Sequence, residues 1–288
     1  MMKKRTMLVL AAVCLVAWVP SPVLAGDPRS IQIKGSDTMV NLVQAWVEGF
    51  MKENPDSFIS VTGGGSGTGF AALISRTCDI AASSRDITAK EVEFAAKKGV
   101  RPKEFRVALD GLAVVVHPSN PVSRLTLDEL AGIFTGRTTN WKEVGGRDSG
   151  IVVLSREVNS GTHVYFKEHV LRKQDPKSRE EFSPEALLLS SSQAIADEVI
   201  QNPSAIGYFG MGYIGKNHAA LSIAKDAASE AVGPTIDNVV SGRYPISRPL
   251  FMFTDAEPRR EVRSFLDFAL SAEGQAIVSQ VDFVPVKK

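Results

Sequence analysis

The chain has 288 residues with 33 basic and 32 acidic side chains, so its formal net charge is +1. A charge this close to balance provides no strongly basic surface, which argues against nucleic acid as a partner. The length fits one large domain or two modest ones.

The chain opens with the features of a secretory leader. A basic stub at 3–5 precedes an apolar run over 7–19, and a small-residue exit ends at Ala25. This order is typical of a signal peptide. The apolar run is shorter than the ~20 residues that a membrane-spanning helix needs, which disfavours a membrane anchor. We therefore expect residues 1–25 to be cleaved and the mature protein to be periplasmic.

Cleavage would leave 30 basic and 32 acidic side chains and one of the two cysteines. The cysteine removed, Cys14, follows Val13 where lipidation would require a small residue, so we do not expect a lipid anchor. Because Cys78 would then be the only cysteine, no disulfide could form within the chain. Its apolar surroundings predict a buried thiol.

Beyond the leader, strand-like and helix-like segments alternate. Strands are expected at 31–33, 58–61, 79–82, 111–117, 151–154, 206–209 and 249–253. Helices are expected over 39–52, 70–76, 88–98, 127–134, 163–171, 194–201 and 258–270. The segment 111–117 is almost wholly apolar, as in a strand buried on both faces. This alternation predicts α/β layers with mostly parallel sheets.

Two lobes joined by crossing strands fit the chain better than separate domains on a linker, because no flexible linker or low-complexity tract is present. The apolar strand after Asp110 and the segment 244–250 are the expected crossings. We therefore assign 27–109 and 246–288 to lobe I and 110–245 to lobe II.

Three loops rich in serine, threonine and glycine each lie between an expected strand and an expected helix, at 35–38, 63–69 and 159–162. A helix N-terminus presents unpaired N–H groups and a partial positive charge, which suit an anion. Hydroxyl groups add neutral donors, and glycine permits close approach to the backbone. Each loop alone is typical of an ordinary helix cap. Together they predict a site for a small oxyanion.

Two of these loops carry further signals. The loop 63–69, GGGSGTG, lacks the lysine of a P-loop and does not fit the dinucleotide-binding fingerprint. Arg156 precedes the third loop, and a guanidinium offers forked donors suited to an oxyanion. A surface ion pair with Glu157 or another acid is the alternative interpretation of Arg156.

Signs of catalysis are weak. The sequence has no GxSxG elbow and no HExxH motif, and His163 and His169 are six residues apart, off the spacing of a helical metal pair. Ser160 and His163 need not meet at a helix start. We therefore expect no enzyme activity, no metal and no cofactor, and the four histidines are expected to be structural.

The motifs taken together resemble the phosphate-binding components, the PstS family, of Pst-type ABC importers in the periplasmic-binding-protein superfamily. They are GSDT at 35–38, GGGSGTG at 63–69, ASSR at 82–85 and RxxNSGT at 156–162, in that order. The segments 108–116, 118–121 and 202–208, together with Trp141, are also similar to family features. The resemblance covers essentially the whole mature chain.

The resemblance implies a type II periplasmic-binding-protein fold, in which two α/β lobes with mixed, mostly parallel sheets close on phosphate. It implies a periplasmic solute-binding protein that captures inorganic phosphate and delivers it to an ABC permease and ATPase complex in the inner membrane. A monomer is expected. The implied phosphate-binding residues are Ser36, Asp37, Thr38, Met39, Ser66, Gly67, Thr68, Ser84, Arg85, Arg156, Ser160, Gly161 and Thr162.

One departure from the family pattern concerns selectivity. Many members have an aspartate after the Ala-Ser pair that accepts a proton from phosphate, whereas this chain has Ser84 followed by Arg85. Our hypothesis is that phosphate is still preferred over sulfate and that Asp37 supplies the acceptor, with Ser84 as the second candidate; Asp37 as a plain helix cap is the alternative. Another tetrahedral oxyanion (sulfate, molybdate or arsenate) or a phosphate-sensing role without transport are the alternative functions.

Overall fold

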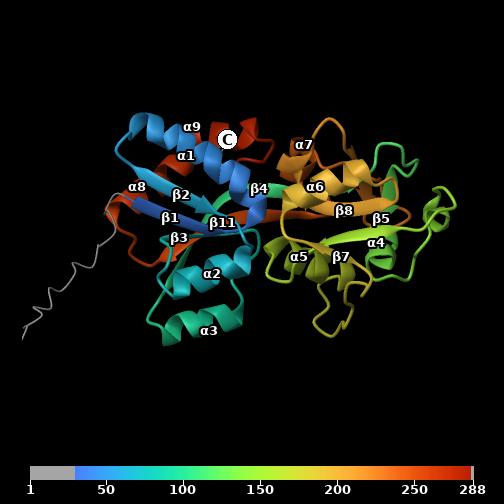
Figure 1. Cartoon of the computed structure of the whole chain (residues 1–288), viewed down its shortest axis with the longest axis horizontal. Helices are drawn as coiled ribbons and strands as arrows, with labels where there is room; N and C mark the ends of the chain where they lie inside the picture. Colours follow the sequence, from blue (N-terminus) through green and yellow to red (C-terminus); the bar gives the residue numbers. More distant parts are fainter. Residues whose placement is uncertain (1–29, 287–288) are drawn as a thin grey trace, which may run out of the picture.

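The computed structural model describes residues 30–286, so the expected leader and Cys14 lie outside the described residues. Within 30–286, no helix is both long enough and apolar enough to cross a membrane. The elements alternate along the chain and form two lobes side by side (Figure 1). This arrangement confirms the predicted two-lobed α/β fold class.

The bounds of the elements follow the chain order. The strands are β1 (Ser30–Gly35), β2 (Phe58–Thr62), β3 (Ile80–Ser83), β4 (Pro102–Val116), β5 (Arg124–Thr126), β6 (Val152–Arg156), β7 (Leu187–Leu189), β8 (Ala205–Gly210), β9 (Ala219–Ala220), β10 (Ser222–Ala224) and β11 (Ser247–Asp255). The helices are α1 (Val40–Glu53), α2 (Ser66–Ile74), α3 (Ala89–Lys97), α4 (Leu127–Phe134), α5 (Gly161–Phe166), α6 (Ser192–Gln201), α7 (Ile236–Val240), α8 (Arg260–Ala269) and α9 (Ala272–Gln280). Short 3-10 helices are η1 (Asp37–Met39), η2 (Trp141–Val144) and η4 (Met211–Tyr213), and η3 (Lys167–Leu171) is a π-helix that continues α5.

One sheet runs through both lobes in the order β2-β1-β3-β11-β4-β8-β6-β7. It is parallel at its two ends, where β1 pairs with β2 and β3, and β6 pairs with β7 and β8. Its centre is antiparallel, through β11, β4 and β8. The sheet is therefore mixed, with the parallel βα units of each lobe on either side of the central strands.

Strand β4 links the two lobes. Its first part pairs with β11 as far as Gly111, and its second part pairs with β8 from Leu112 onward. The strand is longer than the expected 111–117, because 102–106 has no buried position and so lacks the continuous apolar run that marks the second part. Figure 1 shows β4 and β11 running between the blue and the green-gold lobes.

Helices cover both faces of the sheet in the first lobe (Figure 1). On one face, Trp46 of α1 is fully buried and its Nε1–H donates to Gly274 O of α9 at 2.7 Å. On the other face, Phe70 of α2 packs edge-on against Phe253 of β11. Cys78 joins this second cluster as a free, buried thiol, as predicted, and burial raises its pKa to about 12.

Candidate anion-binding site

Three polar loops lie together where the two lobes meet, each at a point where a strand leads into a helix. They follow β1, β2 and β6. Two backbone hydrogen bonds join them, because Gly65 N–H donates to Gly35 O at 2.9 Å and Gly67 N–H donates to Asn159 O at 3.0 Å. The fold thus brings the polar side chains of all three loops into one region.

Two glycines make this close approach possible. Gly65 has φ +91°, a left-handed conformation, and a Cβ there would lie 2.6 Å from Asn159 O. A Cβ on Gly161 would lie 2.2 Å from Ser66 Oγ and 2.7 Å from Ser84 Oγ. Any larger side chain would push the second and third loops apart.

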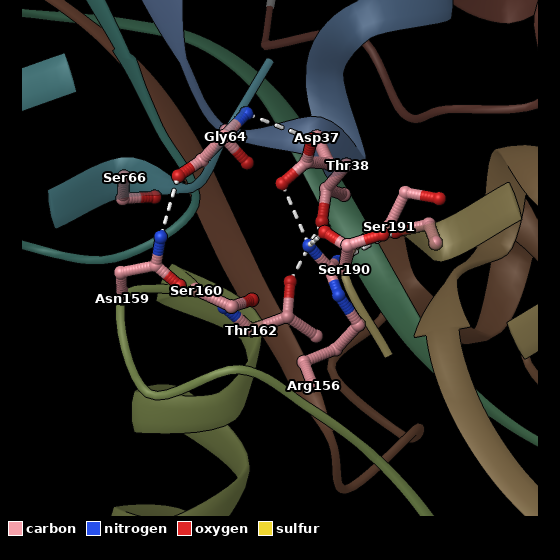
Figure 2. Close-up of polar contacts among 12 residues, drawn as sticks. Asp37, Thr38, Gly64, Ser66, Arg156, Asn159, Ser160, Thr162, Ser190 and Ser191 are labelled. Atoms are coloured by element: carbon pink, nitrogen blue, oxygen red, sulfur yellow. Dashed lines mark hydrogen bonds and ion pairs between the residues drawn. The ribbon is translucent and has the colours of Figure 1, made fainter. Parts of the chain in front are cut away.

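Five buried hydroxyl side chains meet between the loops: Ser36, Thr38, Ser66, Ser84 and Thr162, here called the hydroxyl cluster. Ser36 Oγ donates to Ser84 Oγ at 2.9 Å, and the Thr38 and Thr162 hydroxyls are 2.7 Å apart. Ser84 Oγ also lies 3.4 Å from Ser66 Oγ and 3.5 Å from Thr162 Oγ1. Figure 2 shows Thr38 and Thr162 pointing at each other. Ser84 is therefore the centre of a compact group of neutral donors.

Other expected site residues contribute through the backbone or as caps. Ser160 Oγ accepts from Thr162 N–H at 3.2 Å and from His163 N–H at 3.4 Å, so it caps α5. Met39 is part of the core, and its N–H donates to Ser36 O at 3.1 Å. The N–H of Gly67 donates to Asn159 O in the third loop. These positions hold the loops in place around the hydroxyl cluster.

Arg156 and Asp37 form a partly buried ion pair, here called the cleft pair, between the end of β6 and the loop after β1. Arg156 Nη2 lies 2.6 Å from Asp37 Oδ2 (Figure 2). The side chain of Arg156 is 1% exposed and that of Asp37 is 12% exposed. The partner of Arg156 is thus a partly buried acid from the other lobe, and Glu157 does not pair with it.

The rest of the Arg156 guanidinium is also bonded, to the end of β7 and the residues that follow it. Nε–H donates to Leu189 O at 3.2 Å, Nη2–H to Ser190 O at 2.8 Å and Nη1–H to Ser192 Oγ at 3.1 Å. Asp37 is equally engaged, because its Oδ1 accepts from Gly64 N–H at 2.9 Å. The cleft pair therefore fastens the first lobe to the second.

The structure places two expected ligands away from the hydroxyl cluster. Arg85 forms a two-point bond with Glu91, at 2.8 and 2.7 Å, and its guanidinium lies over the Phe70 ring. The Thr68 hydroxyl is exposed and donates to Gly64 O at 2.6 Å. Arg85 directly follows Ser84 and Thr68 lies two positions after Ser66 in α2, so neither side chain points in the same direction as its neighbour in the hydroxyl cluster.

A second ion pair, Arg248 with Asp110, was missed by the sequence analysis; we call it the crossing pair. Arg248 Nε and Nη2 lie 3.0 and 2.8 Å from Asp110 Oδ2, and both side chains are 0% exposed. Asp110 Oδ1 also accepts from Met211 N–H at 3.0 Å. Burial raises the pKa of the Asp110 carboxyl, and the Arg248 guanidinium opposes this rise.

The crossing pair borders the hydroxyl cluster. Arg248 Nη2 lies 3.0 Å from Thr162 Oγ1 and 3.4 Å from Thr38 Oγ1, and Nη1–H donates to Ser84 O at 3.1 Å. A signal for it does exist in the sequence. Arg248 directly precedes the expected strand 249–253 and Asp110 directly precedes the expected strand 111–117, so both charges lie at the expected crossings, where a buried charge needs a partner.

Behind the cleft pair, the polar side chains Ser155, Tyr208 and His163 satisfy one another. Ser155 Oγ lies 2.7 Å from Tyr208 OH and 3.3 Å from His163 Nδ1. Burial lowers the pKa of His163 to about 4, so the imidazole is neutral near pH 7. His163 also stacks on Phe182. Among residues 30–286, no group of His, Cys, Asp or Glu side chains is arranged to hold a metal ion.

Comparison with known proteins places this geometry in a family. The PBP superfamily domain matches residues 22–273. Phosphate-binding protein PstS of Bacillus subtilis (strain 168) is 35% identical over 262 residues, covering 89% of this chain and 81% of that protein.

Two solved structures are similar throughout. A candidate phosphate ABC transporter substrate-binding protein from Clostridium perfringens, solved with bound phosphate, has a TM-score of 0.80 and 34% identity, covering 90% of this chain and 100% of that one. An ABC-type phosphate transport receptor from Vibrio cholerae has a TM-score of 0.68 and 29% identity, with 88% and 99% covered. The likeness therefore spans both lobes and the site between them.

Proposed function

This chain belongs to the PBP superfamily and, within it, to the family of PstS phosphate-binding proteins, and from that premise we propose that it captures inorganic phosphate and delivers it to an ABC permease and ATPase complex in the inner membrane. It is a binding protein and not an enzyme. The observation that carries the proposal is the hydroxyl cluster, a set of buried neutral donors between two lobes that is bordered by two arginines.

The charges around the cluster suit a small anion held by hydrogen bonds. Each of the two arginines already has a carboxylate partner, Asp37 for Arg156 and Asp110 for Arg248. The anion would therefore be held by oriented N–H and O–H donors and not by an excess of positive charge. A hydrogen bond to a charged group contributes about 1.5–3 kcal/mol, so a few such donors supply substantial affinity.

We propose that the anion is enclosed by closure of the two lobes assigned above, 27–109 with 246–288 against 110–245. The contacts between Thr38 and Thr162, between Asp37 and Arg156, and from Gly67 to Asn159 all join one lobe to the other. A hinge at the change of β4 pairing, near Gly111, would break these contacts on opening. Small-angle scattering should show a smaller radius with phosphate; an unchanged radius with proven binding would contradict closure.

The geometry favours Ser84 over Asp37 as the acceptor for the phosphate proton. Both oxygens of the Asp37 carboxylate are already engaged, by Gly64 N–H and by Arg156. Ser84 lies at the centre of the hydroxyl cluster, and a hydroxyl can accept as well as donate. We therefore propose that Asp37 fastens the lobes and that Ser84 meets the protonated oxygen.

Calorimetric titration of the mature protein with phosphate, sulfate and molybdate tests the proposal. Phosphate should bind with the highest affinity. A higher affinity for sulfate or molybdate would show that this anion, and not phosphate, is the ligand of an oxyanion-binding site. If none of the three anions binds, the proposed function is overturned.

We further propose a periplasmic monomer released by cleavage after Ala25. The basic stub, short apolar run and small-residue exit support the export step. Intact-mass measurement of the exported protein should give a chain that begins at Gly26. A diacylglycerol adduct on Cys14 would contradict it, and sedimentation would identify an oligomer.

A further inference from the structure

Arg248 is a buried cation in the site that none of the family motifs in the sequence includes. It lies in β11 directly opposite Asp110 of β4 in the strand register. Its Nε–H and one Nη2–H donate to Asp110, and the other Nη2–H points at the hydroxyls of Thr162 and Thr38. The guanidinium therefore links the two crossing strands to the hydroxyl cluster.

The direction of the hydroxyl protons follows from this contact. A guanidinium can only donate, so it occupies a lone pair of each hydroxyl that it reaches. The Thr38 and Thr162 oxygens are 2.7 Å apart, and only one of them can donate its proton to the other. The second proton must point out of the pair, toward another acceptor. Arg248 thereby biases both threonines toward donating.

We infer that Arg248 is a positioning residue of the anion site: it occupies a lone pair of the Thr38 and Thr162 hydroxyls, so that the proton not shared between them is donated to the bound oxyanion, while Asp110 holds the guanidinium. This inference rests on the proposed function. Thr38 belongs to the first lobe and Thr162 to the second, so the oriented pair is complete only when the two lobes meet. Arg248 therefore contacts both threonine hydroxyls only when the two lobes are closed.

The surroundings of the crossing pair are built closely enough to fix this orientation. A Cβ on Gly210 would lie 3.0 Å from both carboxylate oxygens of Asp110 and 2.6 Å from Thr38 Cγ2. Arg248 also lies over the Tyr165 ring, at 5.4 Å from its centre. The guanidinium is thus held by its carboxylate, by an aromatic face and by Ser84 O, and has little freedom to turn away from the threonines.

A double-mutant cycle with inorganic phosphate as the probe tests the inference. Calorimetry would compare the wild type with Arg248→Met, Thr162→Val and the double variant. We expect Arg248→Met to weaken phosphate binding by at least about tenfold, and the double variant to bind at least about threefold more tightly than the product of the two single losses predicts. Arg248→Lys should recover part of the affinity, because it keeps the charge but not the fork.

Controls separate this inference from folding and from the proposed function. Arg172→Met is a matched control, because Arg172 pairs with Glu168 and Glu181 and has no contact in the hydroxyl cluster. Thermal melting with and without phosphate reports folding and binding together; if Arg248→Met does not fold, the cycle is run with Arg248→Lys. Wild-type affinity in a folded Arg248 variant, or losses that simply multiply, would overturn the inference. A wild type that does not bind phosphate would instead overturn the proposed function.

Discussion

The cleft pair and the crossing pair place the same two residue types, arginine and aspartate, at the same site in different ways. Arg248 and Asp110 face each other across neighbouring strands, and both are 0% exposed. Arg156 and Asp37 come from different lobes, and the Asp37 side chain is 12% exposed. The sheet fixes the crossing pair, whereas the cleft pair forms only where the lobes meet.

The same kind of ion pair, arginine with aspartate, therefore serves two purposes at this site. A pair fixed by strand register keeps its guanidinium in place whether or not the lobes meet, which suits a group that positions Thr38 and Thr162 each time they come together. A pair that spans the lobes can fasten closure and be released into water on opening, where separated charges are well solvated. Substitutions that break each pair in turn test this difference.

The largest expected effect is on stability, from breaking the crossing pair. Asp110→Asn should lower the free energy of unfolding by about 3–5 kcal/mol, because it leaves the Arg248 charge buried without its carboxylate. Asp37→Asn should cost markedly less, because Arg156 keeps bonds to Leu189 O, Ser190 O and Ser192 Oγ. Urea denaturation of both ligand-free variants gives the comparison. Equal losses would show that the two pairs do not differ in this way.

The next effect is on affinity, from breaking the cleft pair. Arg156→Ala should weaken phosphate binding by at least about tenfold, because it removes the charge-assisted bond to Asp37 that joins the lobes around the anion. Such a bond is worth about 1.5–3 kcal/mol, and 1.4 kcal/mol is a factor of ten. Thr162→Val deletes one neutral donor and should cost less. Calorimetric titration measures both. Unchanged affinity in Arg156→Ala would place phosphate binding away from this site.

The two pairs also differ in how far the sequence could predict them. The loops at 35–38, 63–69 and 159–162 were found because serine, threonine and glycine at a strand-to-helix junction are local signals. The crossing pair joins residues 138 positions apart, so it required the strand register. The cleft pair joins residues 119 positions apart. Arg156 was found as a candidate ligand, but its partner was not.

The prediction of secondary structure from the sequence was wrong where local patterns are weak. Helix α2 begins at Ser66 and not at the expected residue 70, because tertiary packing of the glycine-rich turn outweighs the low helix propensity of glycine. Helix α9 was not predicted, since Ala272–Gln280 has no clear apolar stripe. The short strands β5, β7, β9 and β10 were also missed. The earlier start of α2 shortens the second loop to 63–65, but all three loops still lie between a strand and a helix.

A smaller effect concerns selectivity. If Ser84 meets the protonated oxygen of phosphate, Ser84→Ala should raise sulfate binding relative to phosphate by about threefold or more, because the acceptor that distinguishes the two anions is lost. Asp37→Asn should leave the ratio unchanged even if both affinities fall, since its oxygens serve Gly64 and Arg156. Competition titrations measure the ratio. A shift in Asp37→Asn alone would restore Asp37 as the acceptor.

The smallest expected effect concerns two tyrosines, one near each ion pair. Tyr213 OH donates to Asp37 O at 2.6 Å, from the second lobe to the first. Tyr244 OH donates to Leu112 O at 2.8 Å, beside the crossing. Burial raises the pKa of both phenols, that of Tyr213 to about 12, so both remain donors at neutral pH.

Replacing either tyrosine with phenylalanine removes one hydrogen bond worth about 0.5–1.5 kcal/mol. Because the Tyr213 bond exists only when the lobes meet, Tyr213→Phe should speed phosphate release by a few-fold and leave the unfolding of the ligand-free, open protein nearly unchanged. Tyr244→Phe should do the reverse, since its bond lies within the crossing and persists on opening. Stopped-flow release and urea denaturation measure the two quantities. If both variants lose stability and neither changes the rate of phosphate release, the Tyr213 bond persists when the ligand leaves. The contacts across the cleft would then be as permanent as those at the crossing.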